Sequence, residues 1–169
     1  MKVRMILASA AVCVIAWAGV AGAADEREHP FVMAAAQGGI AEVKLGQLAL
    51  QKASNADVKQ FAQHMVDDHS KANESLIALA QRKNIKLSSD MGEEHQKTYK
   101  RLEKLSGAKF DKAYMKDMVQ DHEKDVKEFE EASNDKSKAD DIRAWAREQL
   151  PVLRNHLQMA KDIEKRLGK

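Results

Sequence analysis

The sequence predicts an all-α protein with a ferritin-like four-helix bundle and a short crossover helix between the second and third long helices. Apolar residues recur at helical spacing over almost the whole chain, and no segment alternates between apolar and polar residues as a half-buried strand would. Only two of the 169 residues are proline. The expected connections are short within the first and last helix pairs and long between the pairs, as in ferritin-like folds. A five-helix up-and-down bundle is the competing topology.

The first 23 residues have the pattern of a bacterial export signal. A short basic start precedes an apolar run over residues 5–20, and Ala21-Gly22-Ala23 is a suitable cleavage site. The apolar run is short for a membrane span. We therefore expect a signal peptide over residues 1–23, a mature domain over residues 24–169 in the periplasm, and no membrane span in the mature chain.

Composition excludes several kinds of site and partner. Cys13 is the only cysteine and lies in the expected signal peptide, so the mature domain should have no disulfide and no thiolate ligand. Removing Lys2 and Arg4 with that peptide leaves 26 basic residues against 26 acidic ones. Such a balance gives no indication of binding to nucleic acid or to an anionic membrane.

The first two long helices are separated by a clear capping signal. Pro30 suits the first turn of a helix, which we expect to end near Ala53. Ser54-Asn55-Ala56-Asp57 is typical of a helix start, and the second helix should continue to about Lys83.

Three further helices are expected after a break at residues 84–89. A short helix spans about residues 90–105, and Ser106-Gly107 ends it. The third long helix covers about residues 108–132. The fourth follows a polar turn and runs from about Asp140 to Leu167, with Pro151 in its interior.

The pattern Met-Val-x-Asp-His occurs twice, ending at His69 and at His122, 53 residues apart. Each copy places a histidine in the middle of an apolar helix face. A buried imidazole needs a hydrogen-bond partner or a metal ion. The other two long helices each carry one ionisable residue at the same kind of position, Glu42 and His156.

These four residues predict a metal site in the bundle core, with Glu42, His69, His122 and His156 as candidate ligands. Imidazole and carboxylate ligands suit a transition metal ion such as Cu, Fe, Zn or Mn. Met65 and Met118 each lie one turn before a histidine and would favour copper as thioether ligands, but methionines at such positions more often only fill space in the core.

Asp68 and Asp121 lie about 100° around the helix from the neighbouring histidines, so they fit better as hydrogen-bond partners than as direct ligands.

Counting residues from the turns separates His122 and His156 by on the order of 10 Å along the bundle and puts Gln149 closer to His122. A di-iron oxidase site is not favoured, because no Glu-x-x-His occurs within the expected helices and only one carboxylate, Glu42, is central on an apolar face. The alternative to a metal site is a non-catalytic envelope protein in which the core His, Asp and Glu side chains only fix the helix register. The sequence shows no nucleophile and base arrangement for an enzyme acting on an organic substrate.

Four segments together resemble one known family over about residues 30–166. They are Ala35-x-x-Gly38-x-x-x-Glu42-Val43-x-Leu45-Gly46, Phe61-Ala62-x-x-Met65-Val66-x-Asp68-His69, Phe110-Asp111-x-x-Tyr114-x-x-x-Met118-Val119-x-Asp121-His122 and Leu150-Pro151-x-Leu153-x-x-His156-Leu157. This pattern is similar to the exported bacterial family of unknown function DUF4142. The resemblance implies a ferritin-like fold and supplies no established activity.

Overall fold

A computed structural model of the chain describes residues 29–168, which form five helices and no strand. The bounds are α1 His29–Lys52, α2 Ala56–Arg82, α3 Gly92–Glu103, α4 Gly107–Asn134 and α5 Asp140–Leu167. The all-α prediction is confirmed, and each expected helix is present within a few residues of its expected ends. The expected signal peptide and its cleavage site lie outside the described residues.

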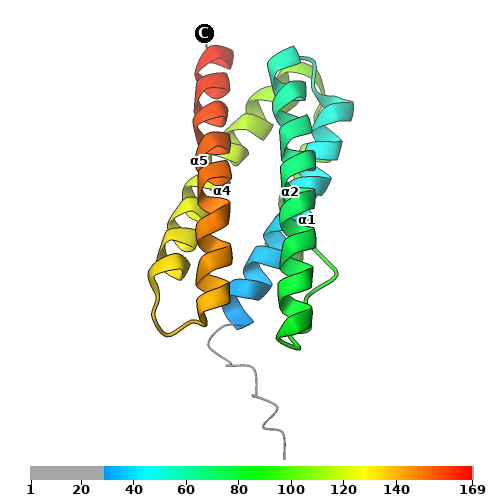
Figure 1. The fold of residues 1–169 in the computed structure, drawn as a ribbon. Helices are drawn as coiled ribbons and strands as arrows, with labels where there is room; N and C mark the ends of the chain where they lie inside the picture. The colour runs from blue at the N-terminus through cyan, green and yellow to red at the C-terminus, as the bar shows by residue number, and fades with distance from the viewer. Residues whose placement is uncertain (1–28, 169) are drawn as a thin grey trace, which may run out of the picture.

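The four long helices form two antiparallel hairpins, α1 with α2 and α4 with α5 (Figure 1). The chain leaves α2 at the lower end of the view, and α4 begins again at the upper end, so α2 and α4 run in the same direction (Figure 1). Helix α3 belongs to the connection that returns the chain along the bundle. The expected crossover between the second and third long helices is therefore present.

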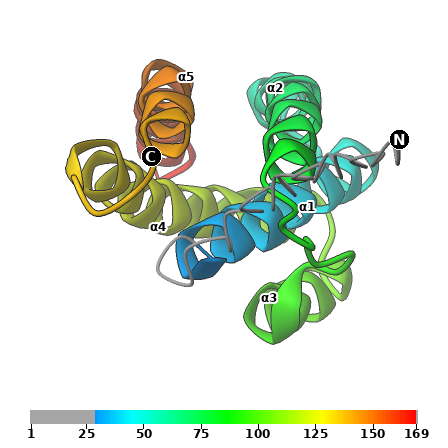
Figure 2. The same ribbon diagram turned by 60° about the horizontal axis from the view of Figure 1, so that its bottom comes forward.

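Helix α3 packs on the outside of the bundle, against α1 and α4 (Figure 2). Of its residues only Leu102 is buried. A helix with one buried side chain cannot contribute an equal share of a core. The architecture is consequently a four-helix bundle with an accessory helix, rather than a five-helix up-and-down bundle.

Close packing of α1 on α2 depends on a glycine. A Cβ atom at Gly46 would lie 2.9 Å from Cγ2 of Val66 and 3.0 Å from the carbonyl oxygen of Ala62. The first contact is shorter than real Cβ atoms make and the second is tighter than most of them, so α2 lies this near because residue 46 has no side chain.

The turn between α1 and α2 is fixed by a carboxylate from another helix. Asp111 of α4 is buried and accepts hydrogen bonds from the backbone nitrogens of Ser54 and Asn55, at 3.1 Å and 3.0 Å. The side chain of Asn55 in turn caps α2 by accepting from the backbone nitrogens of Asp57 and Val58. Acceptors at a helix start satisfy amides that have no partner within the helix.

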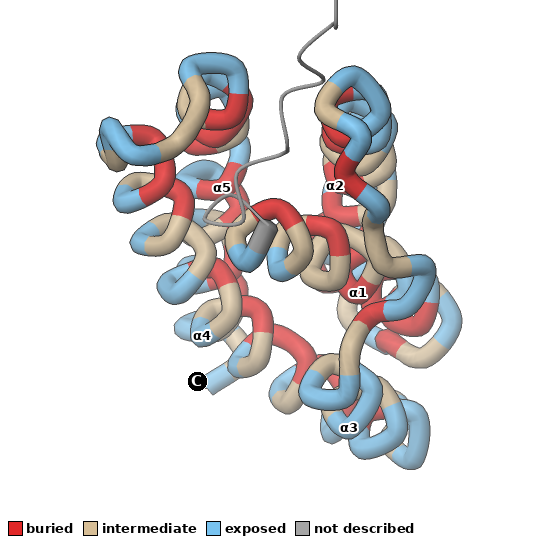
Figure 3. The backbone as a smooth tube through the Cα atoms, turned by 90° about the horizontal axis from the view of Figure 1, so that it is seen from below, coloured by how far each residue is buried: buried red, intermediate tan, exposed pale blue. Residues whose placement is uncertain are grey.

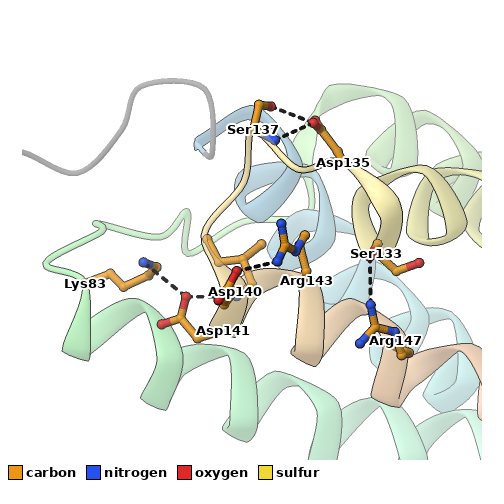
Figure 4. Close-up of polar contacts among 9 residues, drawn as sticks. Lys83, Ser133, Asp135, Ser137, Asp140, Asp141, Arg143 and Arg147 are labelled. Atoms are coloured by element: carbon orange, nitrogen blue, oxygen red, sulfur yellow. Dashed lines mark hydrogen bonds and ion pairs between the residues drawn. The ribbon is translucent and has the colours of Figure 1, made fainter.

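At the opposite end, polar contacts fix the turn between α4 and α5 (Figure 4). Asp135 accepts hydrogen bonds from the backbone and hydroxyl of Ser137, and Arg147 donates to the Ser133 carbonyl at 3.1 Å. Lys83, just after α2, lies 3.2 Å from Asp141 at the start of α5. This end of α5 is therefore tied both to α4 and to α2.

The buried residues lie along the inner side of each long helix (Figure 3), and the apolar ones divide into two clusters. One cluster includes Leu45, Met65, Met118 and Ala160, and the other includes Ala36, Leu76, Phe129 and Leu153. On each long helix, one buried ionisable residue lies between these positions. The core thus has a polar layer of Glu42, His69, His122 and His156 between its two apolar halves.

Helix α5 continues without interruption through Pro151. None of the described helices is long and apolar enough to cross a membrane.

Candidate metal centre

Three histidines from three different helices meet in the polar layer. One ring nitrogen each of His69, His122 and His156 lie within 4.8 Å of one another. The ring centroids are 5.8 Å apart for His69 and His122, 5.4 Å for His69 and His156, and 5.5 Å for His122 and His156. All three side chains are buried. The repeated motif therefore places its two histidines in one cluster, and α5 supplies the third.

Hydrogen bonds determine which ring nitrogen of His122 and of His156 keeps a free lone pair. Nδ1 of His122 lies 2.9 Å from the carbonyl oxygen of Met118, and Nε2 of His156 lies 3.1 Å from Oδ2 of Asp68. A carbonyl and a carboxylate are acceptors, so each ring places its proton on that nitrogen. The lone pairs are then on Nε2 of His122 and Nδ1 of His156.

Those two nitrogens, together with Nε2 of His69, are buried and have no hydrogen-bond partner among the described residues. Leaving a buried polar atom without a partner costs about 1–3 kcal/mol. Three such atoms in one cluster are unusual, because buried polar groups in native proteins are nearly always satisfied. An ion that accepts three lone pairs would remove this cost.

The surroundings keep the three rings neutral. Burial is the main cause that lowers the pKa of His69 well below its ordinary value, and the two other imidazoles lower it further. Burial, with His156 nearby, lowers the pKa of His122 to about 4. The pKa of His156 is also lowered by burial, although the hydrogen bond to Asp68 opposes the shift. Neutral imidazole is the form that binds metal ions.

The expected height difference between His122 and His156 was wrong. Helix α4 ends at Asn134, two residues later than expected, which removes part of the counted offset. A Cα–Cβ bond leans toward the N-terminus of its own helix, so side chains on antiparallel helices lean in opposite directions. His122 leans toward the level of His156, and His156 toward that of His122. Gln149 lines a cavity beside the cluster instead of joining it.

Glu42 lies in a second group of ionisable side chains. One carboxylate oxygen each of Glu42, Asp121 and Asp125 lie within 4.8 Å of one another. Neither oxygen of Glu42 has a hydrogen-bond partner among the described residues, and the same is true of the Tyr114 hydroxyl. Burial, followed by the nearby carboxylates of Asp121 and Asp125, raises the pKa of Glu42 well above its ordinary value.

The candidate residues of the sequence are therefore divided between two groups. His69, His122 and His156 come together, while Glu42 and Asp121 belong to the carboxylate group. Asp68 has the role expected for it, as the hydrogen-bond partner of a ring in the cluster. Met118 contacts His122 through its backbone carbonyl.

Sequence reasoning missed Asp125 as a site residue. It lies three residues after His122, on the same side of α4, and that spacing was the available signal. A charged residue on an apolar face could equally have been a solvated edge of the helix, which is why the pattern alone did not select it.

A cavity of about 230 Å³ lies between α1, α2, α4 and α5, and we refer to it as the interhelical cavity. Its lining includes the aromatic rings of Phe31, Phe129 and Trp145, and the polar side chains of Asp68, His69 and Asp125. Gly38 also lines it, and a Cβ atom there would meet nothing within 4 Å. The cavity therefore reaches the edge of the histidine cluster.

Comparison with known families identifies a match to the model described as Domain of unknown function (DUF4142), over residues 18–163. The chain belongs to this family. A comparison with curated proteins finds no match. The family description names no ligand and no reaction, so it assigns no role to the histidine cluster of this DUF4142 chain.

Among solved structures, the DUF4142 chain is similar to one described as the crystal structure of a DUF305 fragment from Deinococcus radiodurans. The TM-score is 0.73 at 14% sequence identity, over 85% of this chain and 98% of the other. At this identity the likeness concerns the fold alone.

Proposed function

We propose that this DUF4142 protein binds a transition metal ion through His69, His122 and His156. The observation that carries the proposal is the set of three buried ring nitrogens without partners, contributed by three helices to one cluster. A structural network would satisfy these atoms with carbonyl or carboxyl groups, whereas here the hydrogen bonds of His122 and His156 occupy their other nitrogens.

The contact between His156 and Asp68 also supports the proposal of a metal site. Histidines that bind metal ions usually donate their second ring N–H to a carboxylate or a carbonyl, which fixes the ring and makes the free nitrogen a better ligand. His156 has the carboxylate arrangement and His122 the carbonyl arrangement. Both rings are thus held in the form that a metal site requires.

Chemistry of the ligand set narrows the choice of metal. Three neutral imidazoles favour Cu or Zn over Mn, because imidazole suits the former and carboxylate oxygens the latter. Metal–nitrogen bonds of about 2.0–2.1 Å would bring the nitrogens to about 3.3–3.6 Å from one another. The three nitrogens lie within 4.8 Å of one another, so small side-chain movements would bring them to that spacing. Three protein ligands leave at least one coordination position for another group.

Metal titration of chelator-treated protein tests the proposal. We expect one Cu²⁺ or Zn²⁺ per chain, with Fe²⁺ and Mn²⁺ binding more weakly. A ligand that binds only the folded state at about 1,000 times its Kd stabilises it by about 4 kcal/mol. For a domain of this size that corresponds to a rise in Tm of about 10 °C.

His122→Leu should abolish this rise in Tm, because it removes one ligand from the cluster. His64→Leu is the matched control, since His64 is an exposed histidine on α2 and lies outside the cluster. It should respond to metal as the wild type does. A wild-type Tm that neither chelator nor any of the four metals changes would overturn the proposal.

We also propose that the protein is exported to the periplasm, on the basis of the signal-like pattern of residues 1–23. N-terminal sequencing of protein recovered from the periplasmic fraction should begin at Ala24. Recovery of the chain only in the cytoplasm, with residues 1–23 retained, would contradict this assignment.

A further inference from the structure

The interhelical cavity has an aromatic end and an acidic end. Phe31 lies near the start of α1, Phe129 near the end of α4 and Trp145 near the start of α5, which all meet at the lower end of the bundle (Figure 1). Their ring centroids are 5.1 to 6.2 Å apart, so the three rings form one cluster. Asp68 and Asp125 line the cavity nearer to the middle of the bundle, beside His69.

The size of the cavity suits one small organic molecule. An apolar cavity of about 150 Å³ is large enough to bind benzene. The volume of about 230 Å³ found here therefore accommodates an aromatic ring with a short chain attached. Gly38 and the neighbouring alanines, Ala34 and Ala35, line the α1 side of this space. The indole of Trp145 is held in place by a hydrogen bond of 2.8 Å from its Nε1 to the hydroxyl of Ser75.

The ionisable side chains at the cavity are mostly acidic. Asp68, Asp125 and Glu128 line it, against the single cation of Lys71. Asp68 is already engaged, by His156 at 3.1 Å and by Lys71 at 3.5 Å. Glu128 lies 3.9 Å from Lys124 in an exposed pair. Asp125 has neither an ion pair nor a hydrogen bond among residues 29–168.

Asp125 also lies beside Glu42 and Asp121. The carboxylate group that reaches the cavity through Asp125 therefore contains three carboxyls and no cation. Burial is the first cause that raises the pKa of Asp125 to about 8, and the nearby Asp121 and Glu128 raise it further. A positively charged group in the cavity would relieve this repulsion and would provide Asp125 with the hydrogen-bond donor that it lacks.

Spacing along α4 relates the two ends of the cavity. Asp125 and Phe129 are four residues apart on one helix, so their side chains project from the same face and begin about 6 Å apart. A molecule that packs its ring against Phe129 therefore needs a chain of about two carbons to bring a charged group to Asp125.

We propose that the interhelical cavity binds a small arylalkylamine, with its ring among Phe31, Phe129 and Trp145 and its ammonium group at Asp125. The ring gains apolar burial and edge contacts with the aromatic cluster. The ammonium gains a charge-assisted hydrogen bond away from bulk water. The site goes beyond metal binding: of the three histidines proposed as metal ligands, only His69 lines the cavity, whereas His122 and His156 are absent from the lining.

Fluorescence of Trp145 provides a direct readout, because this indole lines the cavity. Trp17 is the only other tryptophan, so Trp17→Phe leaves Trp145 as the sole reporter whether or not the leader is removed. We would titrate this protein with phenethylamine, and in parallel with 2-phenylethanol and 3-phenylpropionate, which replace the ammonium by a neutral and an anionic group. Calorimetry on the unmodified full chain would give the same affinities independently.

We expect saturable binding of phenethylamine, at least ten times tighter than that of 2-phenylethanol, and no measurable binding of 3-phenylpropionate. Asp125→Asn should reduce the affinity for phenethylamine at least tenfold and leave that for 2-phenylethanol within twofold. Glu131→Gln is the matched control, since it makes the same replacement of a carboxyl group by an amide on an exposed face of α4. It should leave both affinities within twofold.

Gly38→Leu should abolish the binding of both compounds, because its side chain would fill the space found at that position. A melting curve for each variant establishes that it is folded. The proposal is overturned by equal affinity for the amine and the alcohol, by tighter binding of the anion, or by wild-type protein that binds none of the three at millimolar concentration. Unchanged phenethylamine binding in folded Gly38→Leu would also overturn it, because the molecule would then bind elsewhere.

Discussion

Replacing His122 by leucine in metal-free protein should stabilise the fold. His122 is completely buried, and its Nε2 has no hydrogen-bond partner among the described residues. Leucine is close to histidine in volume and has no polar atom to satisfy. Because an unsatisfied buried group costs about 1–3 kcal/mol, we expect the variant to gain about that amount at pH 7.5, less what is lost in packing.

His122→Leu removes a hydrogen bond to the Met118 carbonyl oxygen, but this loss does not offset the expected gain in stability. The Nδ1 of His122 donates to the carbonyl oxygen of Met118, four residues earlier in the same helix. That oxygen is also the ordinary backbone acceptor at this position of α4, so the substitution does not leave it without a donor.

The stability advantage of His122→Leu over wild type should increase as the pH falls. The pKa of His122 is about 4 in the folded protein, against an ordinary value of 6.5, because burial disfavours the charged ring. The unfolded chain therefore binds the proton more readily, and the contribution of His122 to stability is lost as pH falls from about 6.5 toward 4. These two values correspond to a loss of about 2 kcal/mol at pH 5. His122→Leu has no such group and should avoid that loss.

Urea unfolding of wild type, His122→Leu and His64→Leu at pH 7.5 and pH 5 measures these differences. The advantage of His122→Leu over wild type should be about 2 kcal/mol larger at the lower pH. Titration of the buried carboxyls is common to all three proteins, so the comparison between proteins removes it. His64→Leu, a change at an exposed position outside the cluster, should not show this advantage.

The expectation would be refuted if His122→Leu were less stable than wild type by 1–3 kcal/mol at pH 7.5 and the difference between the two proteins were the same at pH 5. Such a result would mean that the free nitrogen of His122 has a partner in the folded protein. The histidines would then fix the helix register, and the structural alternative to a metal site would be favoured.

Two further substitutions test how the site and its scaffold are built. Asp68→Asn should lower the metal affinity about 10- to 100-fold, because His156 loses the carboxylate that orients its ring. Calorimetric titration would measure the affinity, with Asp67→Asn as the control because Asp67 is an exposed neighbour. Equal affinities in the two variants would show that Asp68 does not orient His156. Gly46→Ala should destabilise the fold by about 1–3 kcal/mol, since its Cβ would overlap α2. Gly38→Ala, which faces open space, should instead stabilise it by about 0.5–1 kcal/mol, and urea unfolding that gives the opposite order would contradict the packing described here.

Much of the fold follows from local patterns in the sequence. Helical spacing of apolar residues, the cap signal at Asn55 and the break around Gly107 gave the five helices to within a few residues. These features depend on contacts between residues close in the chain, which a sequence pattern records directly. The crossover topology followed from the lengths of the connections, because short turns require antiparallel neighbours.

Candidate residues for the site could be found in the same way, but their grouping could not. A lone ionisable residue on an apolar face is visible in the sequence, and this singled out Glu42, His69, His122 and His156. Whether Glu42 meets the histidines or other carboxyls depends on the rotation of α1 relative to α4. That rotation is set by packing between helices, such as the close approach at Gly46, and no local pattern encodes it.

The sequence by itself thus determined the helical class, the order of the elements and the polar residues that the core must accommodate. The tertiary structure decided which of these residues share a site, because antiparallel helices lean their side chains toward each other and bring His122 and His156 to one level. It also decided that Asp68 orients His156 and that a cavity opens beside Gly38. Contacts across 88 residues and spaces between four helices arise only when the helices pack, so a pattern along one chain cannot specify them.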